Sequence, residues 1–128
     1  MNGDKILVVD DDPDARDIVR TFLDANGYEV TTAATGKEAL AKMEEVHPVL
    51  VLLDVMMPGM DGWEVARVIK NHPEFEDVRI VMLTARSDFT DKQEGLRSGA
   101  DDYIVKPIDL ENLAERVQRN LAARGKQA

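Results

Sequence analysis

The 128-residue sequence contains no cysteine, which excludes disulfide bonds and thiolate metal sites. It also contains no apolar stretch long enough to cross a lipid bilayer. Residues 1–5 lack the basic and then apolar pattern of a signal peptide. Together with a length typical of one domain, these absences predict a single soluble, cytoplasmic domain over residues 1–128 with no effector domain.

Basic residues are also scarce: 16 Lys and Arg stand against 25 Asp and Glu, for a net charge of -9. Contacts with nucleic-acid phosphates require a basic face, so this balance argues against nucleic acid as a direct ligand. Excess acid is often only a solubilising surface. Here the acids cluster, most clearly at residues 10–12, and a cation becomes a natural ligand.

Apolar segments typical of strands alternate five times with segments typical of helices. The predicted strands cover residues 5–9, 28–33, 49–54, 79–83 and 103–105. Residues 49–53 are all apolar without alternation, which is typical of a strand buried on both faces of a parallel sheet. This pattern predicts an α/β fold: a doubly wound, five-stranded parallel sheet of flavodoxin-like order 2-1-3-4-5, with five helices on both faces.

The expected helix boundaries follow from capping residues. Pro13 suits a first helical turn, and Thr35 with Glu38 and Asp61 with Glu64 have the form of capping boxes. The helix expected within residues 87–98 contains an internal glycine and few large apolar side chains. We therefore expect it to be the least stable helix.

Ligands of such open sheets bind at the carboxyl ends of the strands. Four of the five predicted strands end there in reactive residues, namely Asp10 with Asp11, Asp54, Thr84 and Lys106. Crowded carboxylates without His or Cys favour Mg²⁺, or a similar ion such as Mn²⁺. A lysine and a threonine hydroxyl beside them suit phosphoryl chemistry, with Asp54 as the carboxylate that forms an acyl phosphate.

Five motifs, in order and at the expected strand ends, resemble the receiver domain of two-component response regulators, the CheY-like family. They are Val8-Val9-Asp10-Asp11-Asp12, Leu53-Asp54 with Met57-Pro58-Gly59-Met60-Asp61-Gly62, Leu83-Thr84-Ala85, Gly99-Ala100-Asp101-Asp102-Tyr103 and Lys106-Pro107. The resemblance implies a response regulator of a two-component phosphorelay. Such a protein is a signalling phosphoprotein and not an enzyme beyond catalysing its own phosphorylation and dephosphorylation.

The resemblance also implies a role for each residue of the predicted site. Asp54 is the phosphoacceptor, which takes the phosphoryl group from a sensor histidine kinase or phosphotransfer protein. Asp11 and Asp54 bind Mg²⁺ through their side chains and Met56 through its main-chain carbonyl, whereas Asp10 acts through a water molecule. Lys106 pairs with Asp54 and then with a phosphate oxygen.

The switch residues implied by the resemblance are Thr84, which hydrogen-bonds the phosphoryl group, and Tyr103, which changes rotamer. The Lys106–Pro107 peptide bond is expected to be cis. Met56 and Arg86 lie two residues beyond Asp54 and Thr84. We expect them to tune the lifetime of the acyl phosphate by restricting the hydrolytic water.

The implied output is the face formed by the fourth helix, the fifth strand and the fifth helix, which would contact a downstream protein or a fused effector domain. Asp101, Asp102, Lys92 and Arg116 resemble the charge pairs through which some receivers form homodimers, whereas Glu94 and Arg97 depart from that pattern in sign. Dimerisation and a solvated helix surface both stay open.

Five further alternatives arise from the sequence. A flavin protein of this topology needs a phosphate-binding loop after the first strand, where residues 10–12 would repel a phosphate. A dehalogenase-type phosphatase needs a second Asp where Met56 stands. A phosphorylation-independent interaction module of the same fold, and a helix-cap role for Asp12, stay open, as does the choice between a stand-alone regulator and part of a longer protein.

Overall fold

The computed structural model describes residues 3–85 and 99–124. The elements are β1 (Lys5–Val9), α1 (Pro13–Ala25), β2 (Glu29–Ala33), α2 (Gly36–Val46), β3 (Leu50–Asp54), α3 (Gly62–Lys70), a 3-10 helix (Pro73–Phe75), β4 (Arg79–Ala85), β5 (Asp102–Lys106) and α5 (Leu110–Ala123). The helix expected within residues 87–98 lies outside the described residues. Among the helices of the described residues, none is long and apolar enough to cross a membrane.

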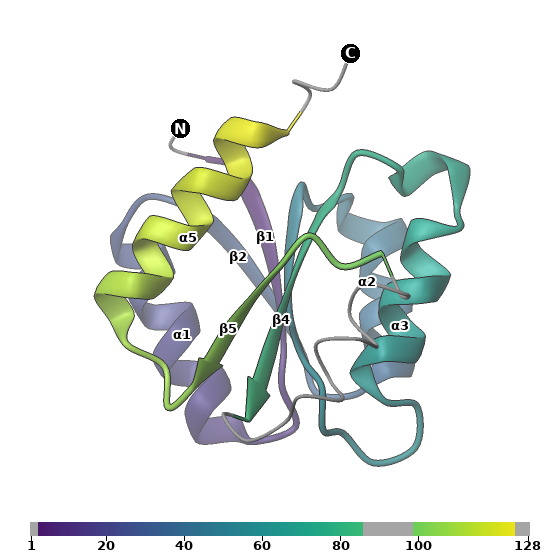
Figure 1. The fold of residues 1–128 in the computed structure, drawn as a ribbon, viewed down its shortest axis with the longest axis horizontal. Coiled ribbons are helices and arrows are strands. Elements are labelled where there is room, and N and C mark those ends of the chain that lie inside the picture. Colours follow the sequence, from purple (N-terminus) through teal and green to yellow (C-terminus); the bar gives the residue numbers. More distant parts are fainter. Residues whose placement is uncertain (1–2, 86–98, 125–128) are drawn as a thin grey trace.

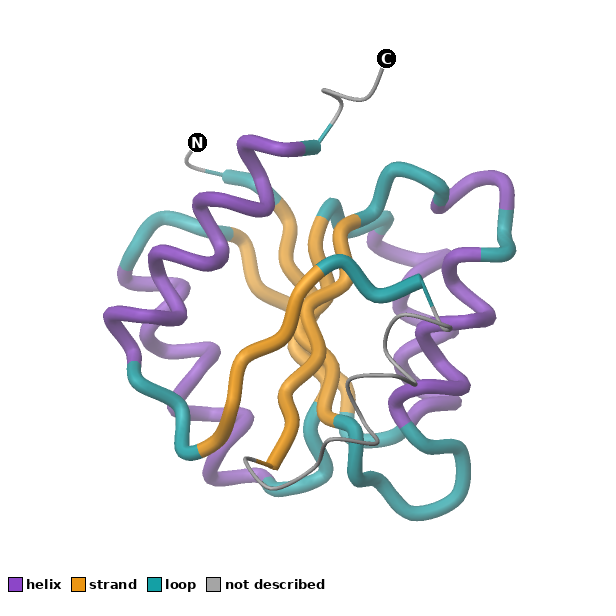
Figure 2. Tube along the Cα trace, in the orientation of Figure 1, coloured by secondary structure: helices purple, strands orange, loops and turns teal. Residues whose placement is uncertain are grey.

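The five strands form one parallel sheet in the order β2-β1-β3-β4-β5, which confirms the predicted doubly wound α/β fold. Helices α1 and α5 cover one face of this sheet, and α2 and α3 cover the other (Figures 1 and 2). The four α-helices of the described residues therefore lie on both faces, as predicted. β2 is an edge strand.

The strand side chains alternate between two cores. Leu7, Leu53 and Met82 pack with the apolar residues of α2 and α3. Ile6 and Leu52, with their neighbours on the same face, pack with α1 and α5. Burial of apolar area in these two layers supplies most of the driving force for folding. It also fixes where each strand ends relative to its neighbours.

β3 lies between β1 and β4, and all of its residues are buried. Leu53 pairs with Val9, and Asp54 pairs with Leu83. The register therefore brings the end of β3 level with the ends of its two neighbours. The absence of alternation in the sequence follows from this central position, because both faces of the strand are covered.

Two predicted strands are longer in the structure than in the sequence analysis. β4 continues through Thr84 to Ala85, and β5 includes Lys106, because Thr84 pairs with Val105 and Ala85 pairs with Lys106. The predicted boundaries at residues 83 and 105 were wrong. The pairing of β4 with β5 therefore keeps Thr84 and Lys106 within the strands.

The helix that follows β3 begins very close to the strand. Asp61 and Glu64 form the predicted capping box at its start. A Cβ atom on Gly62 would clash with the Asp54 carbonyl oxygen, so only glycine allows this approach. The amide of Gly62 donates to the Val55 carbonyl at 3.0 Å. α3 therefore packs directly on the end of β3.

Candidate functional site

Three carboxylates meet at the carboxyl edge of the sheet. Oxygen atoms of Asp10, Asp11 and Asp54 all lie within 4.8 Å of one another. Asp10 and Asp54 are 2% and 4% exposed, whereas Asp11 faces solvent. Asp10 and Asp11 directly follow β1, and Asp54 is the last residue of β3. The structure thus brings together the three acids that the sequence predicted to converge.

Lys106, at the end of β5, reaches two of these acids. Its Nζ atom lies 3.3 Å from Asp54 Oδ1 and 3.5 Å from Asp10 Oδ2. The Lys106–Pro107 peptide bond is cis, as expected. One ammonium group therefore balances part of the charge of three carboxylates, and the cluster retains an excess of negative charge.

The pKa values reflect this excess. Burial, reinforced by the charge of Asp10, raises the pKa of Asp54 from 3.8 to about 6, although Lys106 and the Met56 amide oppose the change. Burial lowers the pKa of Lys106, but the attraction of Asp54 and Asp10 outweighs it and the net change is upward. Ionised Asp54 is therefore stabilised incompletely by the protein alone.

The donor set suits a hard divalent cation. All three side chains offer carboxylate oxygens, two from a buried position and one from the solvent-facing side. Mg²⁺ and Mn²⁺ prefer such oxygen ligands, and Mg²⁺ retains several waters on an open side. The excess negative charge of the three carboxylates over Lys106 also favours a cation. This acidic cluster therefore fits a bound divalent cation.

The β1–α1 loop, residues 10–12, is held by a set of short contacts. The amide of Asp10 donates to the Ala33 carbonyl at 3.2 Å, and the amide of Asp12 donates to Asp10 Oδ1 at 3.0 Å. Arg16 NH1 donates to the main-chain carbonyl of Asp10 at 2.8 Å. The sequence analysis missed Arg16, although a cation one turn after three acids was a usable signal.

Asp12 lies outside the three-carboxylate cluster. Its side chain accepts a hydrogen bond from the amide of Asp14 at 3.0 Å and caps the start of α1, where Pro13 occupies the first turn. This contact confirms the helix-cap interpretation. Its negative charge also suits the positive end of the helix dipole.

Thr84 and Tyr103 lie on the same face of the sheet, because paired residues of parallel strands point the same way: Met82 pairs with Tyr103, and Thr84 pairs with Val105. Thr84 is 3% exposed, and Tyr103 packs partly buried against the core under α2 and α3. Thr84 lies one position beyond the Asp54–Leu83 pair. The two expected switch residues are thus neighbours on one face.

Of the two residues expected to tune the lifetime of the acyl phosphate, the structure describes Met56 and not Arg86. The Met56 side chain is 70% exposed beside the site, and its amide donates to Asp54 Oδ1 at 3.3 Å. Arg86 lies outside the described residues, as do Lys92, Glu94 and Arg97 of the expected dimer face.

A second polar cluster joins the other ends of β4 and β5 to α5. Arg116 NH1 lies 2.6 Å from Asp102 Oδ1. Asn120, 2% exposed, donates to Asp102 Oδ2 and accepts from Arg79. Asp101 pairs with Lys70 at 3.0 Å. Asp102 and Arg116, two of the residues that resemble the charge pairs of dimeric receivers, thus pair within one chain. No sequence pattern indicated that Asn120 would be buried.

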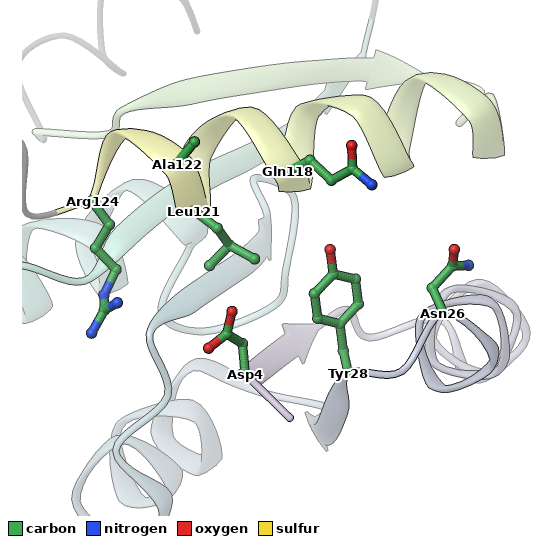
Figure 3. A pocket seen from close by; sticks show the side chains of 7 residues that line it. All are labelled: Asp4, Asn26, Tyr28, Gln118, Leu121, Ala122 and Arg124. Carbon is green, nitrogen blue, oxygen red and sulfur yellow. The ribbon is translucent and has the colours of Figure 1, made fainter. Parts of the chain in front are cut away.

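A separate cavity of about 480 Å³ lies at the opposite edge of the sheet (Figure 3). Asp4 and Tyr28 line it on one side and the last turns of α5, with Gln118 and Leu121, on the other. Neither Lys106 nor the cluster of Asp10, Asp11 and Asp54 lines this cavity. The chemistry of the chain is concentrated at the carboxyl edge and not in this cavity.

The fold and the site define a class of protein: a flavodoxin-like sheet with a carboxylate cluster, a lysine and a threonine at its carboxyl edge. Residues 6–118 match the response regulator receiver domain family. The chain therefore belongs to this family of two-component signalling domains, which interact with histidine kinases and are not a classical enzyme family.

Relatives of two lengths resemble the chain. It is 47% identical over 118 residues to a probable transcriptional regulator ycf27 of Porphyridium aerugineum, covering 92% of this chain and 48% of that protein. It is 45% identical over 114 residues to an uncharacterised 14.6 kDa protein of Leptolyngbya boryana, covering 89% of this chain and 87% of that protein. The chain thus spans about half the length of most curated relatives that it matches.

Solved structures agree in fold. The Vibrio cholerae chemotaxis protein CheY4 is 38% identical with a TM-score of 0.87, covering 91% of this chain and 98% of that one. A CheY-like receiver domain protein from Methanospirillum hungatei is 32% identical with a TM-score of 0.91, covering 99% of this chain and all of that one. The predicted membership of the CheY-like family is confirmed.

Proposed function

We propose that this chain is a phosphorylation switch in which Asp54 accepts a phosphoryl group from the phosphohistidine of a histidine kinase or phosphotransfer protein. One observation carries the proposal: a buried Asp at the end of the central strand lies among two further carboxylates and the Lys106 ammonium. A carboxylate in such a setting is a nucleophile for phosphoryl transfer.

In the proposed transfer, an Asp54 oxygen forms a bond to phosphorus as the bond from phosphorus to the donor imidazole breaks, and the imidazole keeps the electron pair. Lys106, already 3.3 Å from Asp54, neutralises charge on the incoming phosphoryl oxygens. Thr84, on the neighbouring strand, offers its hydroxyl to one of them. The chain thereby catalyses only its own modification.

A divalent cation, Mg²⁺ or Mn²⁺, would offset the negative charge of the phosphoryl oxygens when it is bound. Asp11 and Asp54 would hold it with their side chains and Met56 with its main-chain carbonyl, and Asp10 would contribute through water. The buried and exposed carboxylates of the cluster support this assignment.

The switch ends when water attacks phosphorus and the bond to the Asp54 oxygen breaks, which releases inorganic phosphate and restores the carboxylate. Met56, exposed beside Asp54, would restrict the approach of that water, together with Arg86. A bulky residue at this place therefore favours a longer-lived phosphorylated form.

We propose that residues 1–128 act as one receiver domain whose signal passes to a protein partner or effector domain. Thr84 and Tyr103, which lie on one face of the sheet, would couple the phosphoryl group to the surface around β5 and α5. A relative from Mycolicibacterium smegmatis is named a DNA-binding response regulator. For this chain alone, the net charge of -9 supports a protein partner and not direct contact with nucleic acid.

The test is incubation with Mg²⁺ and acetyl phosphate, followed by intact-mass measurement. The wild type should gain the mass of one phosphoryl group, and Asp54→Asn should gain none. Asp24→Asn removes an exposed carboxylate of α1 and should be phosphorylated like the wild type. An adduct on Asp54→Asn, or none on the wild type, would refute the proposal.

A further inference from the structure

The loop that supplies two of the three carboxylates is held by a residue outside the cluster. Arg16 lies on the second turn of α1, and its NH1 donates to the main-chain carbonyl of Asp10 at 2.8 Å. β1 ends at Val9, so this carbonyl lies beyond the last residue of the strand. The arginine supplies a partner where the strand no longer does.

Besides the ion pair of its Oδ2 atom with Lys106 at 3.5 Å, Asp10 makes three hydrogen bonds around the β1–α1 loop. Its amide donates to Ala33, its carbonyl accepts from Arg16, and its Oδ1 accepts from the amide of Asp12. Hydrogen bonds that involve a charged donor are shorter and stronger than neutral ones. The Arg16 contact is the one of the three that a side chain provides as donor, and a substitution can therefore remove it.

We propose that Arg16 is a positioning residue of the phosphorylation site: it holds the β1–α1 loop so that Asp10 and Asp11 face Asp54 before a cation binds. This inference builds on the proposed function. Arg16 contacts the main-chain carbonyl of Asp10. It acts through Asp10, in the way that partners of metal-ligating residues commonly orient them.

The charge of Arg16 and its hydrogen bond have opposite effects on cation binding. As a positive charge bonded to the main chain of Asp10, Arg16 repels a nearby cation, so a purely electrostatic role means that its removal tightens Mg²⁺ binding. As a positioning residue, it reduces the ordering needed on binding, so its removal weakens Mg²⁺ binding. The sign of the change in affinity therefore separates the two roles.

The chain offers a matched control. Arg20 lies on the same helix, one turn later, and pairs with Asp17 at 2.9 Å and Asp24 at 3.3 Å on the surface. Arg20→Met removes the same charge from the same helix without touching the β1–α1 loop. Arg16→Lys retains the charge but loses the planar donor geometry of the guanidinium.

The experiment measures the Mg²⁺ dissociation constant of wild type, Arg16→Met, Arg16→Lys and Arg20→Met by isothermal titration calorimetry without a phosphoryl donor. Arg16→Met should bind Mg²⁺ roughly tenfold more weakly, as is usual when a partner of a metal ligand is lost. Arg20→Met should bind like the wild type or slightly more tightly. In metal-free protein, the Asp12 amide should exchange its hydrogen faster in Arg16→Met than in the wild type. This amide donates to Asp10 Oδ1, and the bond should open more often once Arg16 no longer holds Asp10.

Acetyl phosphate then provides the second measurement. Arg16→Met should need more Mg²⁺ for half-maximal phosphorylation while approaching the wild-type rate at saturation. Unchanged or tighter Mg²⁺ binding by Arg16→Met, or equal weakening by Arg20→Met, would overturn the inference. If Arg16→Met does not fold, Arg16→Lys takes its place, and it should bind Mg²⁺ more weakly than Arg20→Met does. A wild type that binds Mg²⁺ but gains no phosphoryl group would refute the proposed function alone.

Discussion

Asp54→Asn should stabilise the metal-free protein, although it removes the central residue of the site. Burial and the neighbouring Asp10 raise the pKa of Asp54 from 3.8 to about 6. The folded state therefore binds the Asp54 proton more tightly than the unfolded chain does. Wild-type stability should fall as the pH rises through the window from about 4 to about 6, and it should not recover at higher pH.

The magnitude follows from the size of the shift. A rise of about two pKa units, at 1.36 kcal/mol for each unit, corresponds to about 3 kcal/mol lost at pH 7.5. The 4% exposure of Asp54 leaves little screening by solvent. Because Asn is neutral and of similar size, Asp54→Asn should recover up to about 3 kcal/mol, equivalent to a rise in melting temperature of roughly 10 °C.

The assay is urea unfolding in EDTA at pH 4, 5, 6 and 7.5, followed by the fluorescence of Trp63, a buried residue of α3. The difference between Asp54→Asn and wild type should be near zero at pH 4 and largest at pH 7.5. Asp24→Asn, an exposed carboxylate, should show no such profile. A variant that is equally or less stable than wild type at pH 7.5 would refute the reasoning.

Four further outcomes are expected. Mg²⁺ at a hundredfold excess over its dissociation constant should raise the free energy of unfolding of the wild type by about 2.7 kcal/mol, measured as a higher melting temperature; no shift at millimolar ion would count against the cation site. Gly62→Ala should cost about 3 kcal/mol in thermal unfolding, since its Cβ would meet main-chain atoms; an unchanged melt would contradict the close approach. Asn120→Ala should cost about 2 kcal/mol in urea unfolding because Arg79 and Asp102 each lose a partner, and a neutral effect would mean that water replaces it. Met56→Asn combined with Arg86→Glu should speed loss of the acyl phosphate measured by intact mass, and an unchanged rate would exclude the tuning role.

The pattern of residues was sufficient to predict the sheet and the edge of it that carries the site. Uninterrupted alternation of strand and helix leaves few topologies, because crossovers between parallel strands are right-handed. The apolar run of residues 49–53 predicted a central strand, and its last residue, Asp54, was the predicted phosphoacceptor. Since all strands of a parallel sheet point the same way, Asp10, Thr84 and Lys106 had to meet Asp54 at one edge.

Packing between distant segments determines which groups outside these motifs hold the site and the sheet together. The lengths of β4 and β5 depend on pairing between strands, which local sequence does not encode. Arg16 meets the carbonyl of Asp10, a backbone atom that side-chain patterns do not reveal. Asn120 is buried because it bonds Arg79, 41 residues away. Such contacts depend on distances between segments far apart in the chain, and these distances exist only once the sheet and helices have packed.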